Sequence, residues 1–200
     1  DLAWSRGLGD VYKRQLTQLN LVANHSTKSA LHTLKEVQIL NPYKTIFRDI
    51  VKQSVVLFLS EVLSNSIQEE EKNTDFYNYL EAGLMWLDAH DKISNFHLLF
   101  LLNASRFLGF YPDTSEIERS GFDLLNGSFS EATGNRNIIS GNELFQFKKL
   151  LGINFDSIES VPFSKKERQL VLQIIIRYFE LHLDGFRKPK SLQILETVFN

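Results

Sequence analysis

Residues 96–108 constrain the fold of this chain more than any other segment. Their sequence, FHLLFLLNASRFL, is apolar on every side of a helix and leaves no continuous polar face. Such a helix is stable only when other elements cover it all round. Gly109 and Pro112 follow and predict that the helix ends there. The sequence therefore predicts a central helix over about residues 94–108, buried inside a helical domain.

The spacing of apolar residues changes from strand-like to helical at Pro42. Alternation over residues 16–23, and more weakly over residues 34–39, predicts two strands. Because two strands are not stable alone, we expect residues 16–42 to be the end of a larger sheet domain. Residues 1–15 carry no periodicity and begin with Asp rather than Met. We expect them to be a non-native or disordered leader on a fragment of a longer chain.

Beyond Pro42 the period of 3.6 residues predicts a bundle of helices, so the predicted fold class is mainly α. The helices are expected over residues 46–66, 76–87, 94–108, 140–151, 164–182 and 190–199. Ser140 and Ser164 are each followed three residues later by Glu, which is the spacing of a capping box. Residues 111–139 are mostly polar and predict a long irregular loop, with a short hairpin around residues 122–129.

Composition and motifs exclude several classes of function. The chain has no Cys, which excludes disulfides and thiolate metal sites, and no apolar run long enough for a membrane helix. It has no phosphate-binding glycine loop, no metal-spaced histidines and no nucleophile motif. We expect His97 and His182 to be hydrogen-bonded structural histidines, and Asp88 and Asp91, which flank His90, to lie at a solvated helix end. We therefore predict no catalytic residue, no metal and no cofactor.

Charge is distributed unevenly, although the formal net charge is only −2. Residues 69–91 hold seven acids and one Lys, whereas residues 165–190 hold seven cations and three acids. A surface that faces the phosphate backbone of nucleic acid, or an acidic peptide, would explain the basic stretch. Ordinary solvated helix faces are the alternative, and on charge alone the more common one. The candidates for contact with DNA or a partner are Arg48, Lys52, Arg106, Lys165, Lys166, Arg168, Arg177, Arg187, Lys188 and Lys190.

Three of these candidates have informative neighbours in the sequence. Arg106 lies in the apolar helix and needs either a partner or a route to water. A salt bridge to Glu61 or Asp123 is the structural possibility, and the carboxylate of a bound partner is the functional one. Arg48 and Lys52 are one helical turn apart and form a smaller candidate patch.

Residues 96–113 and 178–192 resemble two segments of the C-terminal domain of the RecO family of bacterial DNA repair proteins, in its cysteine-free form. The positions that match family motifs are Arg106, Gly109, His182, Arg187, Lys190 and Ser191. The resemblance covers about residues 16–200. It implies that residues 16–42 are the remnant of an N-terminal OB-fold barrel and residues 43–200 the helical C-terminal domain.

The resemblance also implies a function. The family acts as a recombination mediator in the bacterial cytoplasm, associated with the nucleoid, and has no cofactor chemistry and no membrane partner. It binds single- and double-stranded DNA, anneals complementary strands, and helps to load RecA together with RecR and single-stranded DNA-binding protein. The tail of the latter is acidic and hydrophobic, and residues 164–182 and 190–199 would frame a groove for it.

Some relatives carry a four-cysteine zinc module after the turn that contains Pro112. Residues 113–129 stand at that place here and have no Cys. Since metal cannot hold this loop, we expect Phe122, Leu124 and Phe129 to anchor it through apolar contacts.

The competing interpretation is a helical protein-interaction module without affinity for nucleic acid. It predicts basic residues dispersed around the surface and no salt-dependent binding of DNA. An enzyme is a more distant alternative, which a cluster of His97 or His182 with buried carboxylates would revive.

Overall fold

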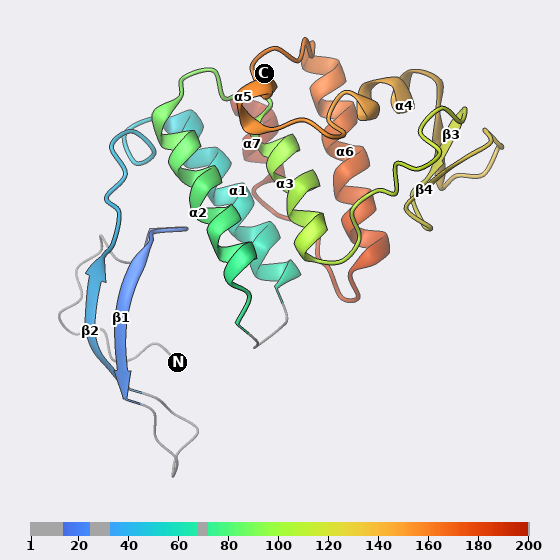
Figure 1. The fold of residues 1–200 in the computed structure, drawn as a ribbon. Coiled ribbons are helices and arrows are strands. Elements are labelled where there is room, and N and C mark those ends of the chain that lie inside the picture. The colour runs from blue at the N-terminus through green and yellow to red at the C-terminus, as the bar shows by residue number, and fades with distance from the viewer. Residues whose placement is uncertain (1–13, 25–32, 68–71, 200) are drawn as a thin grey trace. The chain divides into compact units, whose positions relative to one another are not determined.

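The computed structural model describes residues 14–24, 33–67 and 72–199 of the chain. The chain divides into two compact units, residues 1–44 and residues 45–200 (Figure 1). The predicted leader lies outside the described residues except for its last two positions.

The first unit contains an antiparallel hairpin, as the alternation predicts. Strand β1 (Leu19–Asn24) pairs with strand β2 (Thr33–Ile39), and Leu19 lies opposite Ile39. Leu21, one of the apolar positions of the alternating pattern, is 49% exposed. A two-stranded hairpin of this kind has no core of its own.

The second unit is mainly helical, which confirms the predicted fold class. Its helices are α1 (Ile50–Ser66), α2 (Thr74–Ala89), α3 (Phe96–Phe107), α4 (Gly141–Lys148), α5 (Phe155–Ile158), α6 (Lys165–His182) and α7 (Leu192–Val198). Its strands β3 (Gly121–Asp123), β4 (Ser128–Ser130) and β5 (Ile138–Ser140) form an antiparallel sheet in the order β4–β3–β5. The hairpin of β3 and β4 was predicted. Neither α5 nor β5 was, because elements of three or four residues carry too little periodicity.

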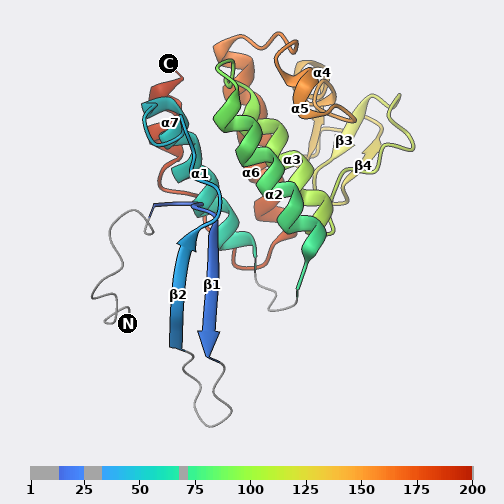
Figure 2. The same cartoon turned by 60° about the vertical axis from the view of Figure 1, so that its left-hand side comes forward.

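Helix α3 is the central helix of this unit, as its sequence predicts. Residues 96–102 are all buried, and α1, α2, α5 and α6 pack against the helix, an arrangement that can be followed in Figure 2. After the last turn, Gly109 adopts a φ of +86°, a conformation that glycine reaches without steric cost. The helix therefore ends where the sequence predicts.

One of the two predicted capping boxes is present. The Ser164 hydroxyl accepts a hydrogen bond from the main-chain N–H of Glu167, and the Glu167 carboxylate accepts one from the N–H of Ser164. These bonds lower the pKa of Glu167. Ser140 is the residue before α4, but its side chain makes no capping bond. Ser140 is also the last residue of β5, where it pairs with Gly121. Strand pairing, rather than a capping bond, therefore fixes its backbone conformation.

The loop between α3 and α4 is held by buried apolar side chains, as predicted. Phe122, Leu124 and Phe129 are at most 3% exposed, and the Phe122 ring packs against both Phe129 and Tyr178. Gly127 has a φ of +66°, and a Cβ atom there would lie 2.6 Å from the Tyr178 hydroxyl. The tight turn between β3 and β4 therefore requires glycine at this position.

Candidate nucleic-acid and partner interface

A buried polar network ties the start of the helical unit to the end of α2. The Asp88 carboxylate accepts hydrogen bonds from the main-chain N–H groups of Thr45 (2.8 Å) and Ile46 (3.0 Å). The Lys52 ammonium donates to Thr45 Oγ1 (2.7 Å) and to the Asp88 carbonyl oxygen (3.2 Å), and Lys52 is only 2% exposed. The expectation of a solvated Asp88 is therefore wrong. Lys52 serves this internal network and does not form a surface patch with Arg48, which is exposed just before α1.

Arg106 reaches solvent from the last turn of α3. Its guanidinium carbon lies 4.3 Å from the centroid of the Tyr111 ring, and the residue is exposed. Glu61 instead accepts hydrogen bonds from Ser191, and Asp123 accepts them from N–H groups of its own turn. The predicted ion pair is therefore wrong, because the helix end gives the cation a route to water and an aromatic ring takes the place of the carboxylate.

Two cations of α6 are held by asparagine side chains. Arg168 Nε donates to Asn95 Oδ1 (3.0 Å), and Arg177 donates to Asn137 Oδ1 (2.9 Å). Both arginines are half-buried, and burial lowers the pKa of Arg168. They link α6 to its neighbours, so part of their hydrogen-bonding capacity is already used inside the unit.

The other five cations of the basic stretch are exposed, but they do not form one patch. Helix α6 has 18 residues, which at 1.5 Å per residue separates its two ends by roughly 27 Å. The Lys165 pair (Lys165 and Lys166) lies at the start of the helix. The Lys188 cluster (Arg187, Lys188 and Lys190) follows its end, on the connection that leads to α7 (Figure 1).

The Lys188 cluster lies on a segment with buried anchors. Ser191 is 2% exposed, and its N–H and hydroxyl both donate to Glu61 Oε2, at 3.0 and 2.9 Å. Asn65 donates to the carbonyl oxygen of Arg187 (3.2 Å), and Pro189 is buried between the exposed cations. Sequence reasoning missed these contacts of Glu61 and Asn65 because both residues lie on α1, more than 120 residues away along the chain.

A small cavity of about 10 Å³ lies between α6 and α7, with His97 of α3 in its wall. The Phe199 ring stacks on His97, with 5.2 Å between centroids, and the guanidinium carbon of Arg168 lies 5.7 Å from the Phe199 centroid.

Burial, together with the charge of Arg168, lowers the pKa of His97 to about 3, so the ring is neutral at neutral pH. Its Nδ1 atom has no hydrogen-bond partner among the described residues. For this nitrogen the expectation of a hydrogen-bonded histidine is wrong.

His182 is a structural residue, as expected. Its Nε2 atom is hydrogen-bonded to the carbonyl oxygen of Leu124 (2.9 Å), and its ring stacks on Phe110 with 5.1 Å between centroids. These contacts tie the last turn of α6 to the sheet.

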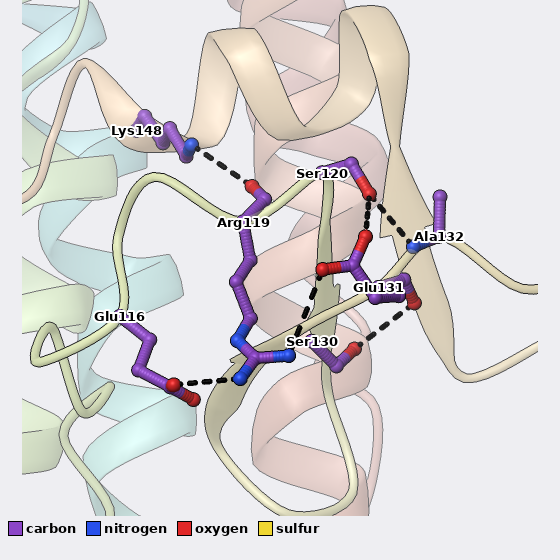
Figure 3. A network of polar contacts seen from close by, with 7 residues as sticks. All are labelled: Glu116, Arg119, Ser120, Ser130, Glu131, Ala132 and Lys148. Atoms are coloured by element: carbon purple, nitrogen blue, oxygen red, sulfur yellow. Dashed lines mark hydrogen bonds and ion pairs between the residues drawn. The ribbon is translucent and has the colours of Figure 1, made fainter.

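The surface of the loop before α4 carries a polar network, which Figure 3 shows. Arg119 pairs with Glu116 (2.7 Å) and Glu131 (3.6 Å), and the Ser120 hydroxyl donates to Glu131 (3.0 Å). Lys148 of α4 donates to the carbonyl oxygen of Arg119 (3.3 Å). Because the ion-paired side chains are 41 to 71% exposed, the pairs add little stability, and the apolar residues beneath hold the loop.

Two further cations lie outside the basic stretch, and sequence reasoning missed them. The ammonium groups of Lys148 and Lys149 lie 5.1 Å and 4.9 Å from the ring centroids of Phe129 and Phe145. The available signal was the closeness of two aromatic residues and two lysines in the sequence FQFKK.

Together these features define a mainly helical domain whose candidate functional groups are exposed cations. Within the ranges that the structure describes, no group of His, Cys, Asp and Glu side chains is placed to hold a metal ion. In the same ranges, no helix is both long and apolar enough to cross a bilayer.

Comparison with known proteins identifies the family. Residues 48–193 match the model of the family described as recombination protein O, C-terminal. The chain is 44% identical over 189 residues to the DNA repair protein RecO of Flavobacterium psychrophilum, and 45% identical over 189 residues to that of Flavobacterium johnsoniae. Each alignment covers 94% of this chain and 79% of the relative. The RecO protein of Christiangramia forsetii is 40% identical over 186 residues, 93% of this chain and 78% of its own. The chain therefore belongs to the RecO family of DNA repair and recombination proteins, which confirms the resemblance.

Proposed function

We propose that this chain is a recombination mediator that binds single- and double-stranded DNA and anneals complementary strands. The observation that carries the proposal is the Lys188 cluster, three exposed cations on a segment anchored by the buried Pro189 and Ser191. Membership of the RecO family supports it. Because the anchors already order this segment, little backbone freedom is lost when the cations meet phosphates.

The physical role of such a surface in annealing is to neutralise charge. Lysine and arginine side chains that contact phosphates release condensed counterions, and this favours binding most strongly at low salt. Two strands held on one basic surface repel each other less, and base pairing then supplies the sequence specificity. This function needs no acid–base catalyst and no cofactor.

We extend the proposal to protein partners, RecR and the acidic, hydrophobic tail of single-stranded DNA-binding protein, with which the chain would help to load RecA. A tail that ends in a carboxylate needs an apolar groove with cations beside it. Lys165 and Arg168 line the cavity between α6 and α7, and Leu172 and Leu195 are apolar parts of its wall. A space of about 10 Å³ is too small for a bulky side chain, so we expect α7 to shift when the tail binds.

The domain assignment is part of the proposal. We assign residues 16–42 to an OB-fold barrel and residues 43–200 to the helical C-terminal domain, acting in the bacterial cytoplasm at the nucleoid. The hairpin of β1 and β2 supports the first assignment, since it exposes apolar residues such as Leu21 that a complete barrel would cover.

The test is binding of labelled DNA, measured by fluorescence anisotropy over a series of salt concentrations. Lys188→Glu/Lys190→Glu reverses two charges of the cluster, and Lys72→Glu/Lys92→Glu makes the same charge change at exposed positions elsewhere. If each cluster lysine contacts one phosphate, the salt slope for single-stranded DNA falls by about 1.4 in the first variant. The second variant is expected to bind like the unmodified chain.

The same titration separates the competing functions. Equal loss of binding in both variants would mean that net charge alone matters, and would remove the cluster from the proposal. No salt-dependent binding by the unmodified chain would favour a helical protein-interaction module. That alternative draws support from the separation of the basic stretch into two groups about one helix length apart.

A further inference from the structure

Phe145 is an aromatic residue that the fold leaves in solvent. It lies on α4 and is 61% exposed, whereas Phe147, two residues later, is fully buried. A single exposed apolar side chain is common and means little by itself. The surroundings of Phe145 are what distinguish it.

A lysine lies between Phe145 and a second aromatic ring. The Lys149 ammonium is 4.9 Å from the centroid of Phe145 and 5.4 Å from that of Phe163, which is 8% exposed. Both distances are within the range of cation–π contacts. The buried ring fixes one side of the lysine, so the cation is held beside the exposed ring.

The start of α6 adds more positive charge at the same place. Gln146 of α4 donates to the Glu167 carboxylate (2.7 Å), which joins α4 to the first turn of α6. Lys165 and Lys166 belong to that turn and are exposed. We name the group of Phe145, Lys149, Phe163, Lys165 and Lys166 the Phe145 patch.

The carboxylates of α4 and of the first turn of α6 are too few to neutralise the Phe145 patch. Glu167 is committed to its capping box and to Gln146. Glu143, in the first turn of α4, is the other carboxylate on these turns and is exposed. Lys149, Lys165 and Lys166 therefore outnumber the one uncommitted acid on α4 and the first turn of α6.

We propose that Phe145 is a base-stacking platform for single-stranded DNA, with Lys149, Lys165 and Lys166 along the path of the phosphates. An exposed aromatic ring in a basic surface matches the two chemical features of a single strand, flat bases and a charged backbone. A duplex hides the faces of its bases, so the patch selects single strands. The inference rests on the proposed DNA-binding function and assigns one of its contacts.

The experiment compares three labelled ligands: a thymidine oligonucleotide, an abasic oligonucleotide of equal length, and a duplex. Phe145→Leu keeps an apolar side chain of similar size but removes the aromatic face. Tyr77→Leu is the matched control, because Tyr77 is an exposed aromatic residue (48%) on α2. Urea unfolding of each variant checks that the fold is intact.

Stacking makes a specific prediction. Phe145→Leu should weaken binding of the thymidine oligonucleotide by at least about fivefold. This is the smallest effect expected when an aromatic ring that stacks on one base is removed. Binding of the abasic strand and the duplex should not change, and Tyr77→Leu should match the unmodified chain on all three ligands.

Other results would overturn the inference. No effect of Phe145→Leu on a chain that binds DNA would exclude stacking and leave the proposed function standing. Equal weakening on all three ligands would show that the ring supports the surface rather than contacts bases. In a parallel binding assay with RecR, loss of RecR binding by Phe145→Leu with DNA binding unchanged would reassign the Phe145 patch to a protein partner. If the unmodified chain binds no DNA, the inference and the proposed function both fail.

Discussion

Replacing Asp88 with Ala should destabilise the helical unit more than any surface substitution. Asp88 Oδ1 is the acceptor for the main-chain N–H groups of Thr45 and Ile46, which begin this unit. Lys52 is buried in the same network. The substitution would therefore leave two N–H groups without their acceptor and reduce the polar surroundings of a buried cation.

The magnitude follows from these contacts. A buried donor that loses its acceptor costs about 1–3 kcal/mol, so two such groups cost about 2–6 kcal/mol. Domains of this size are stable by only about 5–15 kcal/mol, so the change would be a large fraction of the total. The measurement is urea unfolding of the full chain, followed by circular dichroism.

Asp91 supplies the matched control, because it lies three residues later and is exposed. Asp91→Ala should change the free energy of unfolding by no more than about 0.5 kcal/mol. Equal midpoints and slopes for Asp88→Ala and Asp91→Ala would refute the claim that the network stabilises the fold.

Three further predictions concern the core. The pKa of His97 is depressed from about 6.5 to about 3. The contribution of the neutral ring to the free energy of unfolding is therefore complete above pH 6.5 and is lost as the pH falls, by up to about 1.4 kcal/mol per pH unit. His97→Leu should flatten this part of the pH profile of stability, measured by urea unfolding at each pH. Gly83→Ala should lower the melting temperature despite the better helix propensity of Ala, because its Cβ would lie 2.7 Å from the Phe100 ring, whereas Gly134→Ala, in open space, should not. Tyr178→Phe removes a 2.7 Å bond to a main-chain carbonyl oxygen and should cost about 1–3 kcal/mol in chemical unfolding; an unchanged free energy would mean that water replaces the hydroxyl.

Local patterns were sufficient for the main elements of the fold. The apolar sequence of α3 predicted a covered central helix, and Gly109 predicted its end. Phe122 was correctly expected to anchor a loop without cysteines. For α3 and its end the determining signal lies within a few residues of the feature, so it can be read from sequence. The expectation for Phe122 rested on the resemblance to the RecO family.

The candidate site depended on contacts between distant residues. Spacing placed Lys52 one turn from Arg48, but it could not show that Thr45 and Asp88 enclose the ammonium. The Glu61–Ser191 bonds join residues 130 positions apart, and no local pattern predicts them. Such partners are set by how the helices pack, which a single sequence does not reveal.

The most direct test of the central claim is strand annealing. Two complementary strands, labelled for energy transfer and covered with single-stranded DNA-binding protein, would be mixed with the full chain. The proposed function predicts faster annealing that weakens with salt, is lost in Lys188→Glu/Lys190→Glu and is retained in Lys72→Glu/Lys92→Glu. Annealing by the Lys188→Glu/Lys190→Glu variant at the unmodified rate would contradict the assignment of this surface, and no acceleration by the unmodified chain would contradict the proposed function.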